Sequence, residues 1–226
     1  MLMTKFTHAC VRLERGGAGA EQASRSVLVI DPGNFSEVEE ALSGAQAFLV
    51  THEHSDHVDL PRVAAVLEAD PGLQGWAPEK VAGQLKEAAP SCADRIHTAE
   101  PDTEFEAAGF RIQTFGSQHA LIHASIPVVA NIGYLVDGEV FHPGDSFTVP
   151  PGVDVETLLV PIHAPWSKIG EVLDFLIAVR ARRAYPIHNA LLNDRGTGLV
   201  ESHAGRIGGI YGTEFAHLEP GESVEL

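Results

Sequence analysis

Residues 51–57, Thr-His-Glu-His-Ser-Asp-His, carry three histidines and one aspartate, a density that an ordinary strand or helix surface does not show. The residues just before them (47–50) are apolar and predict a short buried strand. Residues 60–67 predict a helix with Pro61 in its first turn, where a missing N–H is tolerated. The fold must therefore hold this cluster on a turn between a strand and a helix.

The spacing within the cluster predicts two neighbouring metal positions. Side chains repeat every two residues along an extended chain, so His52 and His54 point to the same side. The following turn can direct Asp56 and His57 towards an adjacent point. Imidazole and carboxylate groups at two adjacent points are typical of a two-metal site. The alternative interpretation is a polar, solvated loop.

The composition favours one globular domain spanning residues 1–226, or at most two closely merged halves. A chain of 226 residues with 44% hydrophobic residues can bury a sizeable core. Its 15 basic and 31 acidic residues give a formal charge of −16, which disfavours electrostatic capture of nucleic acid or of anionic membranes. A small anionic substrate stays compatible with this charge, because bound divalent cations reverse the local field. The sequence carries no clear mark of an oligomer interface, so the oligomeric state is not predicted.

Cysteine content and the amino-terminal residues predict a cytoplasmic protein. Cys10 and Cys92 are the only cysteines, and their number and spacing fit a reducing compartment. Residues 1–8 lack the apolar segment of a signal peptide, and no apolar run reaches the ~18–20 residues of a membrane span. We therefore expect no membrane partner.

The remaining pattern predicts alternating strands and helices, interrupted by a run of short strands. The first part comprises a strand over 3–14, a flexible loop over 16–24, a strand over 26–30, a helix over 36–44, a strand over 73–77 and a helix that begins at Pro78 and ends before Pro90. The short strands cover 104–106, 110–115, 131–136 and 139–142, the last two joined by a hairpin turn at Asp137-Gly138. A strand over 157–160, a helix over 169–180, a strand over 184–189 and a helix over 196–212 follow. This order is typical of sheets covered by helices.

Three more residues of metal-ligand type follow predicted strands. They are His119, Asp145 and His188, each at or just beyond the end of an apolar segment. Two further polar residues, His8 and Asp31, stand beside strands. Each of these two can brace a metal ligand from the second shell or serve as an ordinary polar residue of a turn.

The order of these residues resembles the metallo-β-lactamase superfamily. The pattern comprises His52-x-His54-x-Asp56-His57, then His119, Asp145 and His188. The resemblance implies an α+β fold, the αββα sandwich, in which two mixed β-sheets lie face to face and helices cover them. It also implies three ligand roles: His52, His54 and His119 for one metal, Asp56, His57 and His188 for the second, and Asp145 as the bridge.

Finer features are similar to the branch that contains the L-ascorbate-6-phosphate lactonases and related hydrolases. They are the segment Thr7-His8-Ala9-Cys10, the pair His119-Ala120 and the compact length. The glycine- and proline-rich arm of the tRNA 3′-end processing nucleases is missing. The pair Asp56-His57 differs from the zinc-ligand pattern of many true β-lactamases. The chain also lacks a second domain for flavin or rhodanese chemistry.

The resemblance implies hydrolysis by a hydroxide shared between two divalent metal ions. Imidazole and carboxylate ligands without cysteine suit zinc, which we expect, and also manganese or iron(II). A metal pair ~3.5–4 Å apart lowers the pKa of the shared water to about 7, and the hydroxide attacks a carbonyl carbon or a phosphorus. Asp56 is the candidate catalytic residue, which orients the nucleophile and accepts its proton.

Four residues are candidates for contact with the substrate: His163, His123, Trp166 and Lys168. For the last two, a buried tryptophan and a solvated lysine are the alternative interpretations. We expect three histidines at the surface, namely His97, His203 and His217. His142 lies close to Asp145 in the sequence, and strand alternation allows it to point either way.

The predicted function is that of a metal-dependent hydrolase that cleaves a small-molecule ester, lactone or phosphoester. A phosphodiesterase or nuclease of the same fold is the alternative enzyme, although 15 basic residues leave little for a basic groove. A metal-bound sensor without turnover is the alternative from another class. The sequence does not identify the substrate, because pocket loops decide it and one metal core hosts many reactions.

Overall fold

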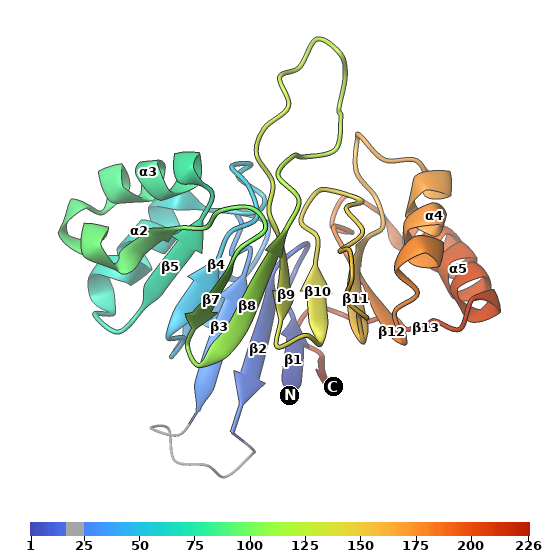
Figure 1. Ribbon diagram of the computed structural model, residues 1–226, viewed down its shortest axis with the longest axis horizontal. Coiled ribbons are helices and arrows are strands. Elements are labelled where there is room, and N and C mark those ends of the chain that lie inside the picture. Colours follow the sequence, from blue (N-terminus) through green and yellow to red (C-terminus); the bar gives the residue numbers. More distant parts are fainter. Residues whose placement is uncertain (17–24) are drawn as a thin grey trace.

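The computed structural model describes residues 1–16 and 25–226, so most of the loop predicted over 16–24 lies outside the described residues. Two seven-stranded sheets lie face to face and helices cover them on the outside (Figure 1). Both sheets contain parallel and antiparallel pairs. The predicted α+β sandwich of two mixed sheets is therefore confirmed.

The first sheet has the strand order β14-β1-β2-β3-β4-β5-β6. Its strands are β1 (Leu2–Lys5), β2 (Val11–Arg15), β3 (Ser26–Ile30), β4 (Ala47–Leu49), β5 (Gln74–Ala77), β6 (Ile96–Thr98) and β14 (Ser223–Glu225). The pairs from β14 to β3 are antiparallel, and those from β3 to β6 are parallel. The prediction of one strand over 3–14 is wrong, because residues 6–10 turn the chain and His8 adopts a φ of 68° there.

The second sheet has the strand order β13-β12-β11-β10-β9-β8-β7. Its strands are β7 (Glu104–Ala107), β8 (Phe110–Phe115), β9 (Gly133–Val136), β10 (Val140–His142), β11 (Thr157–Pro161), β12 (Arg183–Ile187) and β13 (Glu214–Phe215). The predicted hairpin turn joins β9 to β10. Asp137 and Gly138 both have positive φ there, 56° and 72°, as tight hairpin turns require.

Helices cover the outer face of each sheet. They are α1 (Val38–Leu42), α2 (Leu60–Ala69), α3 (Glu79–Ala88) and the 3-10 helix Pro90–Arg95 on the first sheet, and α4 (Ile169–Val179) and α5 (Asp194–Ile210) on the second. Pro61 lies in the first turn of α2, as predicted, and Asp59 caps this helix. The last helix begins before the predicted residue 196, because the Asn193 side chain caps it by accepting the N–H of Gly196.

Strand β3 shows how the core divides into layers. Val27 and Val29 point to one face and pack against the helices of the first sheet. Leu28 and Ile30 point to the other face and pack between the two sheets. A third apolar cluster lies between the second sheet and α4 and α5. A strand buried on both faces reads as a continuous apolar run, which is why β3 was predictable.

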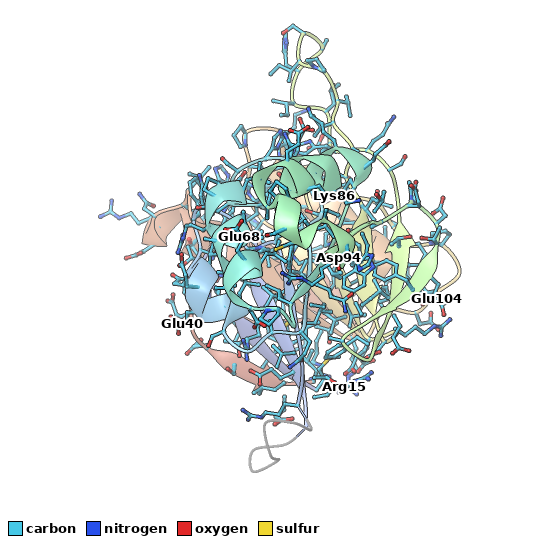
Figure 2. The ribbon with its side chains drawn as sticks, turned by 90° about the vertical axis from the view of Figure 1, so that its left-hand side faces the viewer. Arg15, Glu40, Glu68, Lys86, Asp94 and Glu104 are labelled. Carbon is cyan, nitrogen blue, oxygen red and sulfur yellow. The ribbon has the colours of Figure 1, made fainter. Side chains whose placement is uncertain are left out.

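The surface of the helical layer is polar. Glu40, Glu68 and Asp94 are exposed on the side formed by α1, α2 and the 3-10 helix (Figure 2). The helices thus bury an apolar stripe and present charge to solvent. Within residues 1–16 and 25–226, no helix has the length and apolar content needed to cross a membrane.

Candidate metal centre

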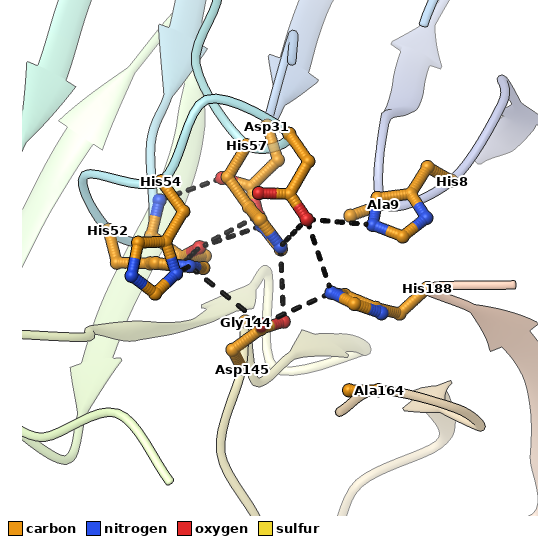
Figure 3. A network of polar contacts seen from close by, with 12 residues as sticks. His8, Ala9, Asp31, His52, His54, His57, Gly144, Asp145, Ala164 and His188 are labelled. Carbon is orange, nitrogen blue, oxygen red and sulfur yellow. Dashed lines mark hydrogen bonds and ion pairs between the residues drawn. The ribbon is translucent and has the colours of Figure 1, made fainter. Parts of the chain in front are cut away.

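The seven predicted ligands come together at one edge of the sandwich, where strands of both sheets end. Figure 3 labels five of them, namely His52, His54, His57, Asp145 and His188. Residues 51–57 follow β4, and His188 directly follows β12. Asp145 lies just beyond β10, and His119 lies in the loop after β8. Both sheets therefore contribute to the centre.

The first group of ligand-type side chains consists of His52, His54, His119 and Asp145. One ligand atom of each lies within 4.8 Å of the others. His52 Nε2 lies 3.0 Å from His54 Nδ1, and His119 Nε2 lies 3.3 Å from Asp145 Oδ2. Two nitrogens bound to one tetrahedral zinc ion are ~3.3 Å apart, so this geometry fits a shared cation.

The second group consists of His8, Asp56, His57 and His188, whose ligand atoms also lie within 4.8 Å of one another. Asp145 faces this group as well as the first. Its Oδ1 lies 3.1 Å from His57 Nε2, and its Oδ2 lies 3.1 Å from His188 Nε2. The carboxylate of Asp145 therefore stands between the two groups.

Three imidazoles are oriented by contacts of their outer nitrogen. The Nδ1 atoms of His57, His119 and His188 lie 2.6, 2.5 and 2.6 Å from oxygen atoms of Asp31, Ala120 and His163. When Nδ1 carries the proton and donates it, Nε2 presents a lone pair to the centre. These three Nε2 atoms and Asp145 Oδ1 are buried without a hydrogen-bond partner among the described residues. Buried polar atoms left in this state fit a bound cation.

Asp31 is buried beneath the cluster and holds His57. Its carboxylate accepts hydrogen bonds from the Thr51 backbone N–H at 2.7 Å and from the Thr51 hydroxyl at 2.8 Å, in addition to that from His57. The φ of Asp31 is 54°, a left-handed conformation that is uncommon outside glycine. The structure thus places Asp31 behind a candidate ligand rather than among the ligand atoms.

His8 reaches the second group from the turn between β1 and β2. Its Nδ1 accepts the backbone N–H of Ala190 at 3.3 Å, so the proton of the neutral ring is on Nε2. Nε2 then donates to Asp56 Oδ2 at 3.1 Å. Burial lowers the pKa of His8 to about 4, which keeps the ring neutral. Although it lies among the ligand-type residues, His8 is arranged as a hydrogen-bond donor to Asp56.

The carboxylates of the centre favour positive charge beside them. Burial alone would lower the pKa of His57, but Asp145 and Asp31 hold it well above 6.5. Burial also opposes the charged form of His188, and Asp145 raises its pKa to about 9. Divalent cations would supply this positive charge in place of protons. For His52, burial and the neighbouring His57 lower the pKa well below 6.5, and Asp145 opposes them only in part.

The four candidates for substrate contact lie at different places. The indole Nε1 of Trp166 donates to Asp145 Oδ2 at 3.0 Å, so this side chain belongs to the wall of the centre. His163 contributes its backbone carbonyl, which is the partner of His188. Lys168 is exposed and directly precedes α4, and His123 is exposed in the loop over residues 116–131.

The remaining histidines divide into buried and surface positions. His142 is buried, donates from Nε2 to the carbonyl of Ala9 at 2.8 Å and accepts the N–H of Gly144 at Nδ1. It therefore supports the turn before Asp145. The histidines expected at the surface are each partly exposed, namely His97, His203 and His217.

Asn131 is a residue of the site that sequence reasoning missed. It is buried, its Oδ1 accepts the N–H of Asp145 at 2.9 Å and its Nδ2 donates to the carbonyl of Pro143 at 2.9 Å. Both contacts fix the turn that carries the carboxylate between the two groups. A single asparagine before an apolar segment gives no sequence signal for this role.

The fold and the site define an αββα sandwich with two adjacent histidine and aspartate groups that could hold metal. A family model described as a β-lactamase superfamily domain matches residues 2–188. The chain belongs to this family.

Two curated relatives extend the comparison. The chain is 37% identical over 228 residues to Protein Rv0786c of Mycobacterium tuberculosis, covering 99% of this chain and 98% of that protein. It is 28% identical over 193 residues to the UPF0173 protein PF0020 of Pyrococcus furiosus, covering 80% of each. The first of these similarities spans nearly the whole of both proteins.

Solved structures share the fold at low sequence identity. Igni18, a metallo hydrolase of Ignicoccus hospitalis, matches with a TM-score of 0.69 and 18% identity over 99% of this chain and 97% of that one. A metal-dependent hydrolase of Parabacteroides distasonis matches with a TM-score of 0.71 and 16% identity over 96% and 92%. CmlA, a diiron β-hydroxylase of Streptomyces venezuelae, matches with a TM-score of 0.71 and 14% identity over 100% of this chain and 54% of that one.

Proposed function

We propose that the protein is a metal-dependent hydrolase that binds two divalent cations and cleaves an ester, lactone or phosphoester in a small molecule. The observation that carries this proposal is the position of Asp145, whose carboxylate faces the ligand atoms of both groups. Membership of the β-lactamase superfamily supports it. The names of the two hydrolase structures of similar fold agree with it.

In this proposal each group holds one cation. His52, His54 and His119 would hold the first, Asp56, His57 and His188 the second, and Asp145 would contact both. The donor set contains imidazole and carboxylate but no thiolate, which suits zinc and also manganese or iron(II), and we propose zinc. Bound cations would lower the pKa of a water to about 7 and polarise the substrate oxygen.

Asp56 is the proposed catalytic residue. Its side chain is 23% exposed, more than those of the buried ligand candidates His57 and His188, so it can face an entering molecule. Burial alone would raise its pKa, but the neighbouring imidazoles of His188 and His8 hold the pKa well below 3.8. The carboxylate therefore stays ionised and can accept a hydrogen bond from the attacking water, which orients that water.

The charge of the chain favours a small substrate over a nucleic acid. With a formal charge of −16, the protein repels a polyanion except where cations are bound. The phosphodiesterase or nuclease activity is therefore the second candidate, and a sensor without turnover is the third. A lactonase related to the L-ascorbate-6-phosphate branch remains a proposal within the first class. The cytoplasmic location also remains a prediction, supported by two buried cysteines that are not paired with each other.

The test is reconstitution of metal-stripped protein with zinc, manganese or iron(II), followed by metal analysis and a substrate panel. The panel contains esters, lactones, thioesters, the phosphomonoester p-nitrophenyl phosphate and the phosphodiester bis-p-nitrophenyl phosphate. We expect two equivalents of metal and turnover of at least one ester, thioester, lactone or phosphomonoester. Turnover of the phosphodiester alone would favour the second candidate, and two bound metals without any turnover would favour the sensor. Failure to bind metal would overturn all three.

A further inference from the structure

A groove of about 430 Å³ opens beside the metal centre, a volume within the ~300–1,000 Å³ range of small-molecule pockets. Its sides come from three segments close in sequence to residues of the centre. Residues 120–122 follow His119, and Phe147 lies two residues after Asp145. Residues 165–168 lie between His163, whose carbonyl contacts His188, and α4. Most of these side chains are apolar. The lining comprises Ala120, Leu121, Ile122, Phe147, Pro165, Trp166, Ser167, Lys168 and Glu171.

Trp166 forms the wall shared by the groove and the metal centre. Its Nε1 donates to Asp145 Oδ2 at 3.0 Å, and its ring centroid lies 5.6 Å from that of His119. On the groove side, the ring of Phe147 lies 5.3 Å from that of Trp166. A molecule in the groove therefore lies one side chain away from the carboxylate that faces both groups.

Two exposed apolar side chains lie on the outer side of the groove. Leu121 is 60% exposed and Ile122 is 37% exposed. Both belong to the loop over residues 116–131, which extends beyond the rest of the molecule between β8 and β9 (Figure 1). Exposed apolar residues beside a site occur at ligand-binding grooves and also at protein–protein contacts, and here they adjoin the metal centre. Among the described residues that line the groove, the charged ones are Lys168 and Glu171. They have opposite signs, so the groove lacks the strong net charge of the whole chain.

We propose that this groove binds an apolar acyl or aryl group of the substrate, so that the preferred substrates carry a chain of several carbons next to the bond that is cleaved. This inference rests on the proposed hydrolase function. The occupant follows from the continuity of the groove with the metal centre through Trp166 and from the apolar side chains, which supply six of its nine lining residues. Leu121 would then set specificity by covering the apolar group.

The test is a chain-length series in whichever class of the panel turns over, with p-nitrophenyl esters from acetate to octanoate or lactones with alkyl substituents of matching length. Because each added methylene group would be buried in the groove, we expect kcat/KM to rise by about two- to fourfold per carbon. The Leu121→Ser variant should flatten this dependence. The matched control is Leu199→Ser, at a 63% exposed leucine on α5 outside the groove. This variant should keep the wild-type dependence of kcat/KM on chain length.

A binding measurement separates this inference from the proposed function. Linear carboxylates from butyrate to octanoate are titrated into zinc-loaded protein by calorimetry. We expect tighter binding with length in the wild type and in Leu199→Ser, but not in Leu121→Ser. This result without turnover of any panel member would overturn the hydrolase proposal and leave the groove supported. Turnover and binding that do not depend on chain length would overturn the groove assignment.

Discussion

The imidazole of His8 donates a hydrogen bond to the carboxylate of Asp56, with 3.1 Å between Nε2 and Oδ2. The backbone N–H of Ala190 occupies Nδ1 and so fixes the tautomer. His8 holds a left-handed φ of 68°, a conformation that costs a histidine energy and that the turn between β1 and β2 maintains. A buried donor aimed at a candidate metal ligand orients that ligand, as outer hydrogen-bond partners do in metal sites.

Replacing His8 by phenylalanine should weaken metal binding without removing a ligand. Loss of an outer partner typically lowers metal affinity by about 10- to 100-fold, and we expect a change of this size in zinc affinity measured by chelator competition. His8→Gln should recover part of the affinity, because its amide can still donate to Asp56. His97→Gln, at a partly exposed histidine on β6, is the control and should match the wild type. Equal zinc affinity in folded His8→Phe would contradict the positioning role.

The variant Asp145→Asn should lose metal from both groups at once. Its carboxylate lies 3.1–3.3 Å from Nε2 atoms of His57, His119 and His188, so a neutral amide removes charge that both cations would share. We expect fewer than two equivalents of zinc by elemental analysis. We also expect turnover to fall by more than about 100-fold, which exceeds the typical effect of losing an outer hydrogen-bond partner. Asp154→Asn, at an exposed aspartate, is the control. Two tightly bound zinc ions in Asp145→Asn would refute the shared role.

The parts of the site that sequence reasoning predicted are those with a local pattern. Residues 51–57 stand between an apolar strand and a helix whose start carries Pro61, so the turn and its ligand-type residues could be located. His119, Asp145 and His188 were identified from their order along the chain and their resemblance to a known pattern. Which side chains face one another depends on the packing of two sheets, and no periodicity encodes this.

The errors in the predicted fold have local causes. Residues 6–10 turn the chain without glycine or proline, so the segment over 3–14 read as one strand. Strand β6 is three residues long and follows a 3-10 helix, which leaves too short a run for alternation to appear. The acidic segment over residues 213–226 contains β13 and β14, two short edge strands that are held by pairing with β12 and β1.

Gly33 should be intolerant of a side chain, whereas Gly83 should accept one. A Cβ at residue 33 would lie 1.8 Å from the carbonyl oxygen of Asp56, so the turn of the metal centre would have to move. Overpacking of this kind costs about 1–3 kcal/mol or more, and we expect Gly33→Ala to lower both the free energy of unfolding and zinc affinity. Gly83→Ala, in α3 with nothing within 4 Å of the added atom, should raise the free energy of unfolding by about 0.5–1 kcal/mol. Denaturant titration with and without zinc measures both effects, and unchanged zinc affinity in Gly33→Ala would contradict the prediction.

Lys5 is a buried cation whose effect on stability should depend on pH. Its side chain is fully enclosed, with Nζ donating to the carbonyl of Phe6 at 3.1 Å and to Asn189 Oδ1 at 3.3 Å. Burial lowers its pKa from 10.5 to about 8, although nearby carboxylates oppose this. Between these two values the unfolded chain binds more protons than the folded one, so this group makes folding more favourable as pH rises from 8 to 10.5. Below pH 8 the full cost of the buried charge remains.

The variant Lys5→Met removes this dependence on pH. Its free energy of unfolding relative to the wild type should fall by about 2–3 kcal/mol as pH rises from 7.5 to 10.5, because only the wild type gains stability from the titration of Lys5. Loss of the two hydrogen bonds shifts the whole difference by about 1–2 kcal/mol but leaves its slope unchanged. Denaturant titrations at several pH values measure this slope. For the control Lys86→Met, on the surface helix α3, the free energy of unfolding should change with pH as it does in the wild type. Parallel profiles for Lys5→Met and the wild type would mean that Lys5 titrates as a solvated lysine and that its burial does not lower its pKa.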